Sequence, residues 1–104
     1  MWNARLPGIG LKPALLISRR VVTINLRPIV ARISSVPRER AIPPTAVGIA
    51  PGEVAGLSQP SWALCHDMFT LLSPDALVER LGQIAPLSLY EVEAALGYTL
   101  GLAG

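Results

Sequence analysis

The side chains that could do chemistry in this 104-residue sequence are mainly cations, and most of them lie in its first 40 positions. The basic residues of that segment are Arg5, Lys12, Arg19, Arg20, Arg27, Arg32, Arg38 and Arg40. With one acid, Glu39, they give residues 1–40 a net charge of +7, whereas Arg80 and six acids give the remainder −5. A cationic surface attracts polyanions, of which RNA and DNA are the commonest. The asymmetry therefore indicates nucleic-acid binding, with plain solvation and pairing with the acidic half of the fold as alternatives.

The composition limits the classes of protein to which the chain can belong. Hydrophobic residues make up 51% of it, charged residues only 15%, and ten prolines interrupt the apolar runs, which is typical of short strands and turns. The length predicts a single domain over residues 1–104. No apolar run reaches the roughly 18 residues of a membrane-spanning helix, and no secretory leader is evident. We therefore expect a cytoplasmic protein that contacts no membrane.

Several kinds of catalytic or cofactor site find no support in the sequence. There is no zinc-ligand spacing, phosphate-binding loop, Rossmann glycine pattern or serine elbow, so we expect no metal and no cofactor. The single cysteine, Cys65, cannot form an internal disulfide and is predicted to be a small buried hydrophobe. The high apolar content also predicts that another subunit covers part of the surface.

Apolar runs of strand length predict strands along most of the chain. The predicted strands are residues 2–6, 14–17, 29–33, 46–49 and 62–65, with 68–71 as a further candidate. Residues 21–26 are ambiguous between a strand and a basic loop with one apolar side. Residues 34–44 are rich in arginine and proline and predict a polar connection.

The last third of the chain predicts two helices. The Ser-Pro-Asp sequence at 73–75 is typical of a helix start and Gly82 of a helix end. A second helix is predicted from Pro86 or Ser88, with Ser88 and Glu91 as a capping box. Its buried stripe would be Leu89, Val92, Leu96 and Leu100. The whole pattern predicts a compact antiparallel β-barrel or sheet with terminal helices.

Segments along the chain resemble, in order, the strands of the MazF/PemK toxins. These segments are residues 10–18 (GLKPALLIS), 29–34 (IVARIS), 56–57 (GL) and 60–65 (PSWALC). The segments at 80–82 (RLG), 92–96 (VEAAL) and 100–102 (LGL) resemble that family's closing two helices. The resemblance covers nearly the whole chain. It implies an α+β fold, an SH3-like antiparallel β-barrel of the CcdB/MazF type with C-terminal helices.

The resemblance also implies a toxin of a type II toxin–antitoxin system. Such a toxin cleaves single-stranded RNA, chiefly mRNA, sequence-selectively and without a metal; it forms a homodimer and is inhibited by a cognate, MazE-like antitoxin. The family's usual Arg-Pro at the start of the second strand matches Lys12-Pro13, and its usual Thr at the end of the third strand matches Ser34 or, one place along, Ser35. The implied catalytic residues are therefore Lys12 and Ser34. The RNA-binding candidates are Arg19, Arg20, Arg32, Ser35, Arg38, Arg40 and His66.

RNA cleavage without a metal makes three chemical demands. The 2′-hydroxyl must lose its proton, the charge on the phosphorane must be stabilised, and the leaving 5′-oxygen needs a proton. Lys12 keeps a positive charge but lacks the planar fork that holds two phosphate oxygens, so activity would be lower or would depend on a neighbouring arginine. A lysine that is buried can also act as a base. Without the resemblance, Lys12 would be interpreted as a surface lysine and Ser34 as a turn-forming hydroxyl.

His66 is of the residue type most used for proton transfer near neutral pH, and Asp67 follows it. If this segment is extended, adjacent side chains point to opposite faces, so Asp67 cannot orient His66. The family does not rely on a histidine here, and we interpret His66 as a peripheral RNA contact or a surface residue rather than a catalyst. Phe69 is interpreted as a core or dimer-interface residue that could also stack on a base.

Two other functions stay open. One is a non-catalytic nucleic-acid-binding member of the same fold, in which Lys12 and Ser34 are signs of decay. The other is a toxin that inhibits a protein target such as gyrase, because fold alone does not decide function. An RNase loses cleavage when the cation at Lys12 is removed, an RNA binder loses only salt-dependent affinity, and a protein-directed toxin would depend on the C-terminal helix.

Overall fold

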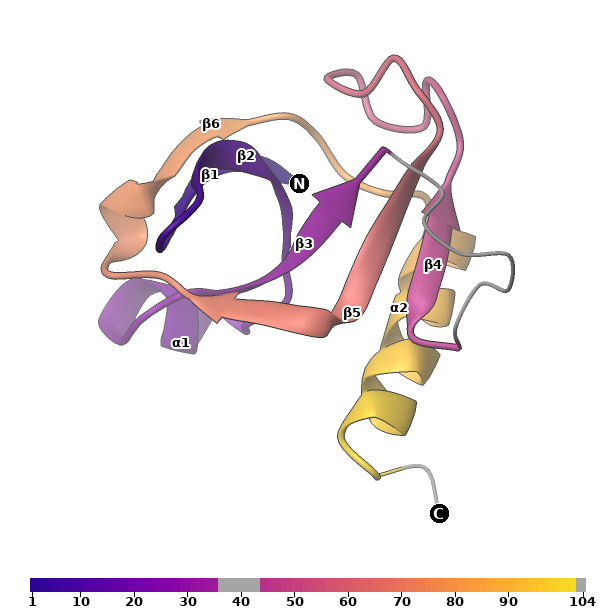
Figure 1. Cartoon of the computed structure of the whole chain (residues 1–104). Helices are drawn as coiled ribbons and strands as arrows, with labels where there is room; N and C mark the ends of the chain where they lie inside the picture. Colours follow the sequence, from indigo (N-terminus) through magenta and orange to yellow (C-terminus); the bar gives the residue numbers. More distant parts are fainter. Residues whose placement is uncertain (36–43, 103–104) are drawn as a thin grey trace.

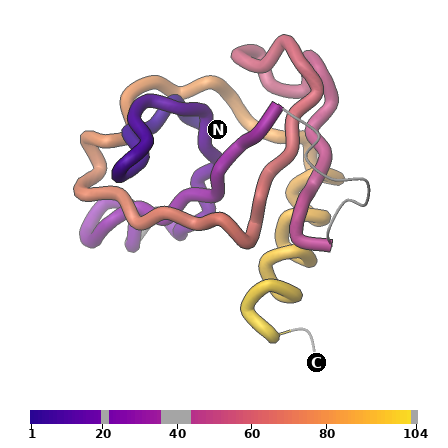
Figure 2. The backbone as a smooth tube through the Cα atoms, in the orientation of Figure 1, coloured from indigo at the N-terminus to yellow at the C-terminus, as the bar shows by residue number. Residues whose placement is uncertain are grey.

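The computed structural model describes residues 1–35 and 44–102, with only the backbone described at residues 20–21. Six strands form one antiparallel sheet in the order β4-β5-β3-β2-β1-β6. The strands are β1 (Trp2–Leu6), β2 (Gly10–Leu16), β3 (Ile29–Ser34), β4 (Ala46–Ile49), β5 (Ser61–Thr70) and β6 (Leu77–Arg80). The sheet coils into the ring seen in Figures 1 and 2, and α2 (Pro86–Thr99) stands beside β4 and β5. The expected antiparallel barrel is confirmed as an open ring, with β4 and β6 at the edges of the described sheet.

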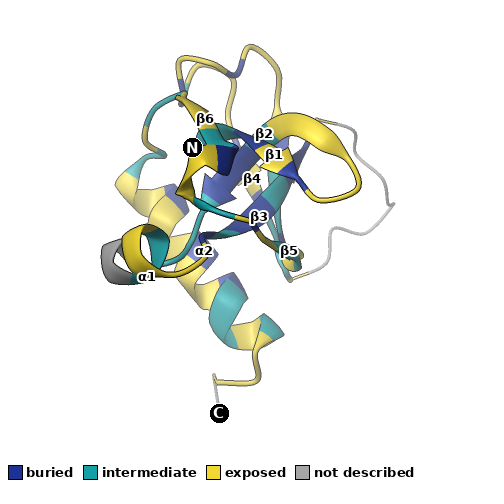
Figure 3. Cartoon of the chain, turned by 90° about the vertical axis from the view of Figure 1, so that its left-hand side faces the viewer, coloured by how far each residue is buried: buried dark blue, intermediate teal, exposed yellow. Residues whose placement is uncertain are grey.

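Two clusters of buried side chains lie on opposite faces of the sheet. Neighbouring residues alternate between them: Ala14 and Val30 belong to one cluster, whereas Leu15 and Ala31 belong to the other. α2 covers the second cluster, and Figure 3 shows buried and exposed sides along this helix. Cys65 lies in the same cluster without exposed surface, and burial raises the pKa of its thiol. The prediction that this cysteine is a small buried hydrophobe is confirmed.

The β1–β2 hairpin extends β2 beyond its predicted start. β2 begins at Gly10 rather than at Ala14, because pairing with β1 continues through Lys12 and Pro13. Gly10 has a φ of 110°, a conformation that side chains rarely adopt and that lets the chain turn back after a short loop. Pro13 is tolerated because β2 pairs with β3 only from Ala14 onward, so no N–H is needed on that side. Lys12 therefore lies on a paired strand and not in a loop.

The segment 21–26, predicted as a strand or a basic loop, instead forms most of the helix α1 (Arg20–Asn25), with residue 26 as its C-cap. Its valine and isoleucine favour strands by propensity, but the Thr23 N–H donates a helical hydrogen bond to the Arg19 carbonyl at 2.9 Å. The segment connects β2 to β3, which already pair with each other. A strand here would have no partner, whereas a short helix satisfies its own backbone groups.

β5 is a single strand where the sequence predicts two. It bends at a bulge, because Arg32 of β3 pairs with Leu64 whereas Ala31 pairs with Met68. Residues 65–67 therefore lie opposite no residue of β3. The His-Asp pair in this segment interrupts the apolar pattern without ending the strand, since a bulge accommodates extra residues while the ladder continues on both sides.

The helix predicted over residues 73–82 is wrong. After one 3₁₀ turn, η1 (Pro74–Ala76), the chain enters β6 and pairs with β1. Asn3 Nδ2 donates to Glu79 Oε1 at 3.0 Å across this pair of strands. The helix-start signal is local, whereas β1 offers an open edge whose backbone groups need partners. Strand pairing therefore overrides the local signal.

The last helix, α2, begins at Pro86 as predicted, but the capping box is wrong. Ala85 is the N-cap residue, Ser88 is buried in the first turn, and Glu91 is exposed. The carboxylate of Glu53, from the loop after β4, takes the place of the predicted capping box.

The buried side of α2 matches only half of the predicted apolar stripe. Val92 is buried and Leu96 packs against the core, whereas Leu89 and Leu100 are 47% and 55% exposed. Ala95 is buried in their place, since a small side chain lets the helix lie close to the sheet. No helix among the described residues is long and apolar enough to cross a membrane.

Gly56→Ala should destabilise the protein, because a Cβ at this position would lie 2.7 Å from Cδ2 and 3.0 Å from Cβ of Leu81. We expect the free energy of unfolding in urea to fall by about 1–3 kcal/mol. Ala55→Ser, at the exposed neighbouring position, should change it by less than about 0.5 kcal/mol. Equal effects of the two substitutions would show that Leu81 does not restrict this position.

Candidate active site

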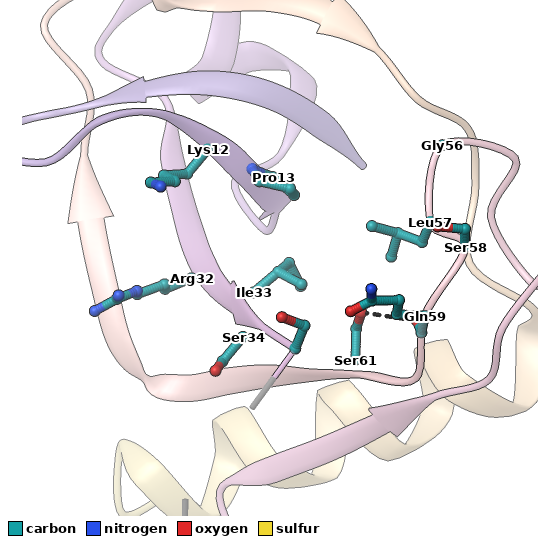
Figure 4. Close-up of a pocket in the computed structure, with 11 residues that line it drawn as sticks. Lys12, Pro13, Arg32, Ile33, Ser34, Gly56, Leu57, Ser58, Gln59 and Ser61 are labelled. Atoms are coloured by element: carbon teal, nitrogen blue, oxygen red, sulfur yellow. Dashed lines mark hydrogen bonds between the residues drawn. The ribbon is translucent and has the colours of Figure 1, made fainter. Parts of the chain in front are cut away.

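A pocket of about 450 Å³ opens where β2 and β3 separate (Figure 4). The pairing of the two strands ends with Ala14 opposite Arg32, so the start of β2 and the end of β3 form two separate walls. The loop between β4 and β5 forms the third wall. The pocket brings together four of the predicted site residues, namely Lys12, Arg32, Ser34 and Ser35.

The walls from β2 and β3 carry polar side chains on one face of the sheet. Ile33 points into the core, which turns its neighbours Arg32 and Ser34 to the opposite face. If the register of β2 and β3 continued by two residues, Lys12 would lie opposite Ser34, so these two side chains share that face. Lys12 is exposed, whereas Ser34 is only 9% exposed. The two candidate catalytic residues therefore face one pocket from neighbouring strands.

The wall between β4 and β5 was not predicted from the sequence. It consists of Gly56, Leu57, Ser58, Gln59 and Ser61. Leu57 is buried and anchors the loop in the core, and the Ser61 hydroxyl donates to the Gln59 carbonyl at 3.1 Å, the dashed line of Figure 4. By composition this segment is an ordinary loop of Gly, Pro and Ser. The sequence feature that could have indicated this wall is that residues 56–57 and 60–65 belong to the segments that resemble the toxin family.

Glu53 fastens this loop to the start of α2. Its carboxylate accepts hydrogen bonds from the N–H groups of Ala85 (2.9 Å) and Ala50 (3.4 Å) and from the Ser88 hydroxyl. Burial acts to raise the pKa of this carboxyl, but the three hydrogen bonds outweigh it and hold the pKa below the ordinary 4.5. A carboxylate from the loop thus caps α2 in place of the predicted pairing of Ser88 with Glu91.

The pocket is lined by cations, by neutral polar groups and by the apolar side chains of Pro13, Ile33 and Leu57. Lys12 and Arg32 contribute two positive charges, and no acid is among the lining residues that the structure describes. Asp67 lies just outside, with its Oδ2 3.6 Å from Nη1 of Arg32. In the described part of the chain, no three His, Cys, Asp or Glu side chains are grouped as metal ligands would be. Such a lining is suited to binding an anionic group such as a phosphate.

His66 and its neighbours on β5 do not line the pocket. The exposed His66 shares a hydrogen bond of 2.7 Å between its Nδ1 and Oγ1 of Thr45, whereas Asp67 contacts Arg32. The two side chains therefore have separate partners, as the alternation of an extended strand predicts. Phe69 is partly buried and packs against one of the two core clusters, which confirms its interpretation as a core residue.

The remaining arginine candidates are Arg19, Arg20, Arg38 and Arg40. Arg19 is exposed, directly before α1, and is not a lining residue. The side chain of Arg20 lies outside the described residues, as do Arg38 and Arg40 entirely.

The fold and the pocket define a small open barrel with a cationic pocket at the separated ends of two strands. Residues 4–100 match the family model of the PemK-like, MazF-like toxin of type II toxin–antitoxin systems. Because this match spans nearly the whole chain, the protein belongs to that toxin family.

Solved structures of toxins share this fold. The Mycobacterium tuberculosis toxin MazF-mt6 matches with a TM-score of 0.79 at 22% sequence identity, covering 100% of both chains. An endoribonuclease in complex with its cognate antitoxin, from a mycobacterial species, matches with a TM-score of 0.76 at 25% identity, covering 97% of this chain and 92% of the other. An Mtb toxin matches with a TM-score of 0.72 at 23% identity, covering 92% and 97%. No curated protein matches the sequence.

Glu53→Gln should lower the free energy of unfolding at pH 7 by about 1 kcal/mol, because it weakens the hydrogen bonds that the carboxylate accepts from Ala85 and Ser88. The folded-state pKa of Glu53 is depressed, so its contribution is present above the unfolded-state pKa and is lost as the pH falls through the folded-state value. The difference between wild type and variant, measured by urea unfolding from about pH 7 to pH 3, should therefore shrink on acidification.

Glu79→Gln is the matched control for this series. Its carboxylate accepts one exposed hydrogen bond, from Asn3, so the substitution should have little effect at any pH. A Glu53→Gln difference that stays constant across the pH range would contradict the capping role.

Proposed function

We propose that this toxin is a sequence-selective, metal-independent endoribonuclease of single-stranded RNA, and that the pocket between β2 and β3 is its active site. The observation that carries the proposal is the pocket itself, which gathers Lys12 and Ser34 from different strands into one cationic cavity. Membership of the MazF-like toxin family supports it, as does the likeness to a mycobacterial endoribonuclease at 25% identity.

In the proposed reaction a ribose 2′-hydroxyl loses its proton to solvent water and its oxygen bonds to the adjacent phosphorus. The bond from phosphorus to the 5′-oxygen of the next nucleotide breaks, that oxygen takes a proton from water, and a 2′,3′-cyclic phosphate remains. We assign to Lys12 the stabilisation of the negative charge that develops on the phosphorane. A role as base would require a buried lysine, and Lys12 is exposed. Ser34 would donate a hydrogen bond to a phosphate oxygen from its largely buried position beside the pocket.

Single-stranded RNA is the substrate that fits this site, because its bases can be splayed out and contacted individually. Arg32 and Ser35 line the pocket and would contact the nucleotides at the cleaved bond. Arg19 and His66 lie outside it and would contact flanking nucleotides. The roles of Arg20, Arg38 and Arg40 in RNA binding stay predictions from the sequence.

We propose a cognate antitoxin and a second copy of this chain as the protein partners. The mycobacterial endoribonuclease was solved with its own antitoxin, which supports the first. α2 exposes large side chains, with Leu87, Tyr90 and Tyr98 at 69%, 71% and 61% exposure. Exposed aromatic and aliphatic surface of this kind is typical of protein interfaces.

The test is incubation of the purified protein with a long single-stranded RNA in excess EDTA, with the products mapped. Wild type should cut at discrete positions. Lys12→Ala should lower the rate by about 100-fold or more, since one group that stabilises transition-state charge contributes about 10²–10³ in kcat. Arg5→Ala removes the same charge from β1 outside the pocket and should leave the rate near that of wild type.

Uncut RNA with an intact fold by circular dichroism would overturn the proposal. RNA that stays whole but binds with strong salt dependence would point to a non-catalytic nucleic-acid-binding toxin relative. Neither cleavage nor binding would point to a protein target such as gyrase, and the exposed side of α2 would then be the surface to test.

A further inference from the structure

Arg32 combines two properties: it lines the pocket and it contacts a carboxylate outside it. Its Nη1 lies 3.6 Å from Oδ2 of Asp67. A guanidinium has five N–H donors in a planar fork, so a contact at one nitrogen leaves other donors for a second anion. Lys12 has a compact ammonium group and cannot hold two phosphate oxygens in a fixed plane. Arg32 can therefore supply what the lysine at the start of β2 lacks.

We propose that Arg32 is the phosphate-holding guanidinium of this site and that Asp67 is the residue that positions it. The inference rests on the proposed function and adds to it a second catalytic cation and the group that orients that cation. The phosphate at the cleaved bond would lie between Lys12 and Arg32, with the ammonium on one side and the planar fork on the other.

The sheet places the two cations side by side. Arg32 pairs with Ala14, and Lys12 lies two residues before Ala14 on the same face of β2. In a paired ladder such diagonal neighbours have their Cα atoms about 7–8 Å apart. Here the pairing ends at Ala14, and the long side chains of Lys12 and Arg32 both line the pocket that opens beyond it. In Figure 4 both side chains leave their strands toward the same side. One phosphate group can therefore contact both cations.

The bulge of β5 brings Asp67 to Arg32. Residues 65–67 lie opposite no residue of β3. Cys65 and His66 are held by hydrogen bonds to Thr45, which precedes β4. The backbone N–H of Cys65 donates to the Thr45 carbonyl at 2.9 Å, and the imidazole of His66 shares a hydrogen bond of 2.7 Å with the Thr45 hydroxyl. The third residue of the bulge, Asp67, faces Arg32 instead. Bulges beside active sites commonly redirect a side chain in this way.

The ion pair between Arg32 and Asp67 contributes little to the stability of the fold. The two side chains are 30% and 34% exposed, and exposed pairs contribute little to the free energy of unfolding. An arginine side chain has many rotamers in solution, and a contact at Nη1 restricts the guanidinium to fewer of them. The main effect of Asp67 is therefore on the position of the cation, and its removal should affect catalysis more than folding.

Arg32→Lys keeps the charge but removes the fork, and should lower kcat for cleavage of the mapped RNA about 10-fold or more with little change in KM. Asp67→Asn should lower kcat by about 10-fold through misplacement of Arg32, with the unfolding midpoint in urea nearly unchanged. Asp67→Glu should restore part of this loss. Arg5→Lys and Asp75→Asn make the same chemical changes outside the pocket and should behave as wild type.

The outcomes separate this inference from the proposed function. Wild-type kcat in Arg32→Lys, beside an inactive Lys12→Ala, would overturn the inference and leave the endoribonuclease proposal standing. An Asp67→Asn defect that follows a loss of stability, without rescue by Asp67→Glu, would make Asp67 a structural residue and overturn its positioning role.

If the wild type cuts no RNA, the proposed function fails, and equilibrium binding of the same RNA then tests Arg32 by itself. Weaker binding by Arg32→Lys than by Arg5→Lys would support the phosphate-holding role. Equal binding by the two variants would overturn it.

Discussion

The pairing of β3 with its two neighbours is the constraint on which the rest of the structure depends. On one side β3 pairs with β2 only as far as Arg32 opposite Ala14, and on the other it pairs with β5 across a bulge at the same residue. Because the first pairing ends there, Lys12 and Ser34 lie on separated strands and a pocket opens. Because the second contains the bulge, Asp67 reaches Arg32. A slip of β3 by one residue would exchange its two faces and remove both features.

The separation of charge along the sequence persists in the folded chain. Among the described residues, Arg32 and Asp67 form the one ion pair, so direct charge pairing between the acidic and basic halves is limited to this contact. Other acids make contacts within the fold instead: Glu53 caps α2 and fastens a wall of the pocket, and Glu79 accepts one exposed hydrogen bond between β1 and β6. Among the described cations of the first 40 residues, Lys12 and Arg32 give the pocket its positive charge, which suits the proposed anionic substrate.

The strands were largely predictable, because a half-buried strand leaves a local apolar pattern. β1, β3 and β4 lie within one residue of their predicted bounds. The errors occur where a distant partner outweighs local preference. Residues 21–26 have the composition of a strand, but the strands on either side pair with each other, so the segment is helical. Residues 73–75 carry a helix start, yet the chain that follows pairs with the open edge of β1.

By itself, the sequence determined the cationic half of the chain, most of its strands, the resemblance to the toxin family and, through that resemblance, the candidates Lys12 and Ser34. Only the tertiary structure decided which groups meet. It placed Arg32 and Lys12 in one pocket, added the loop that includes Leu57 as a third wall, and made Glu53 the cap of α2. The physical reason is that a local pattern records which face of a strand is buried. Distances between strands depend on register and on a bulge, which form only when the partner strand is in place.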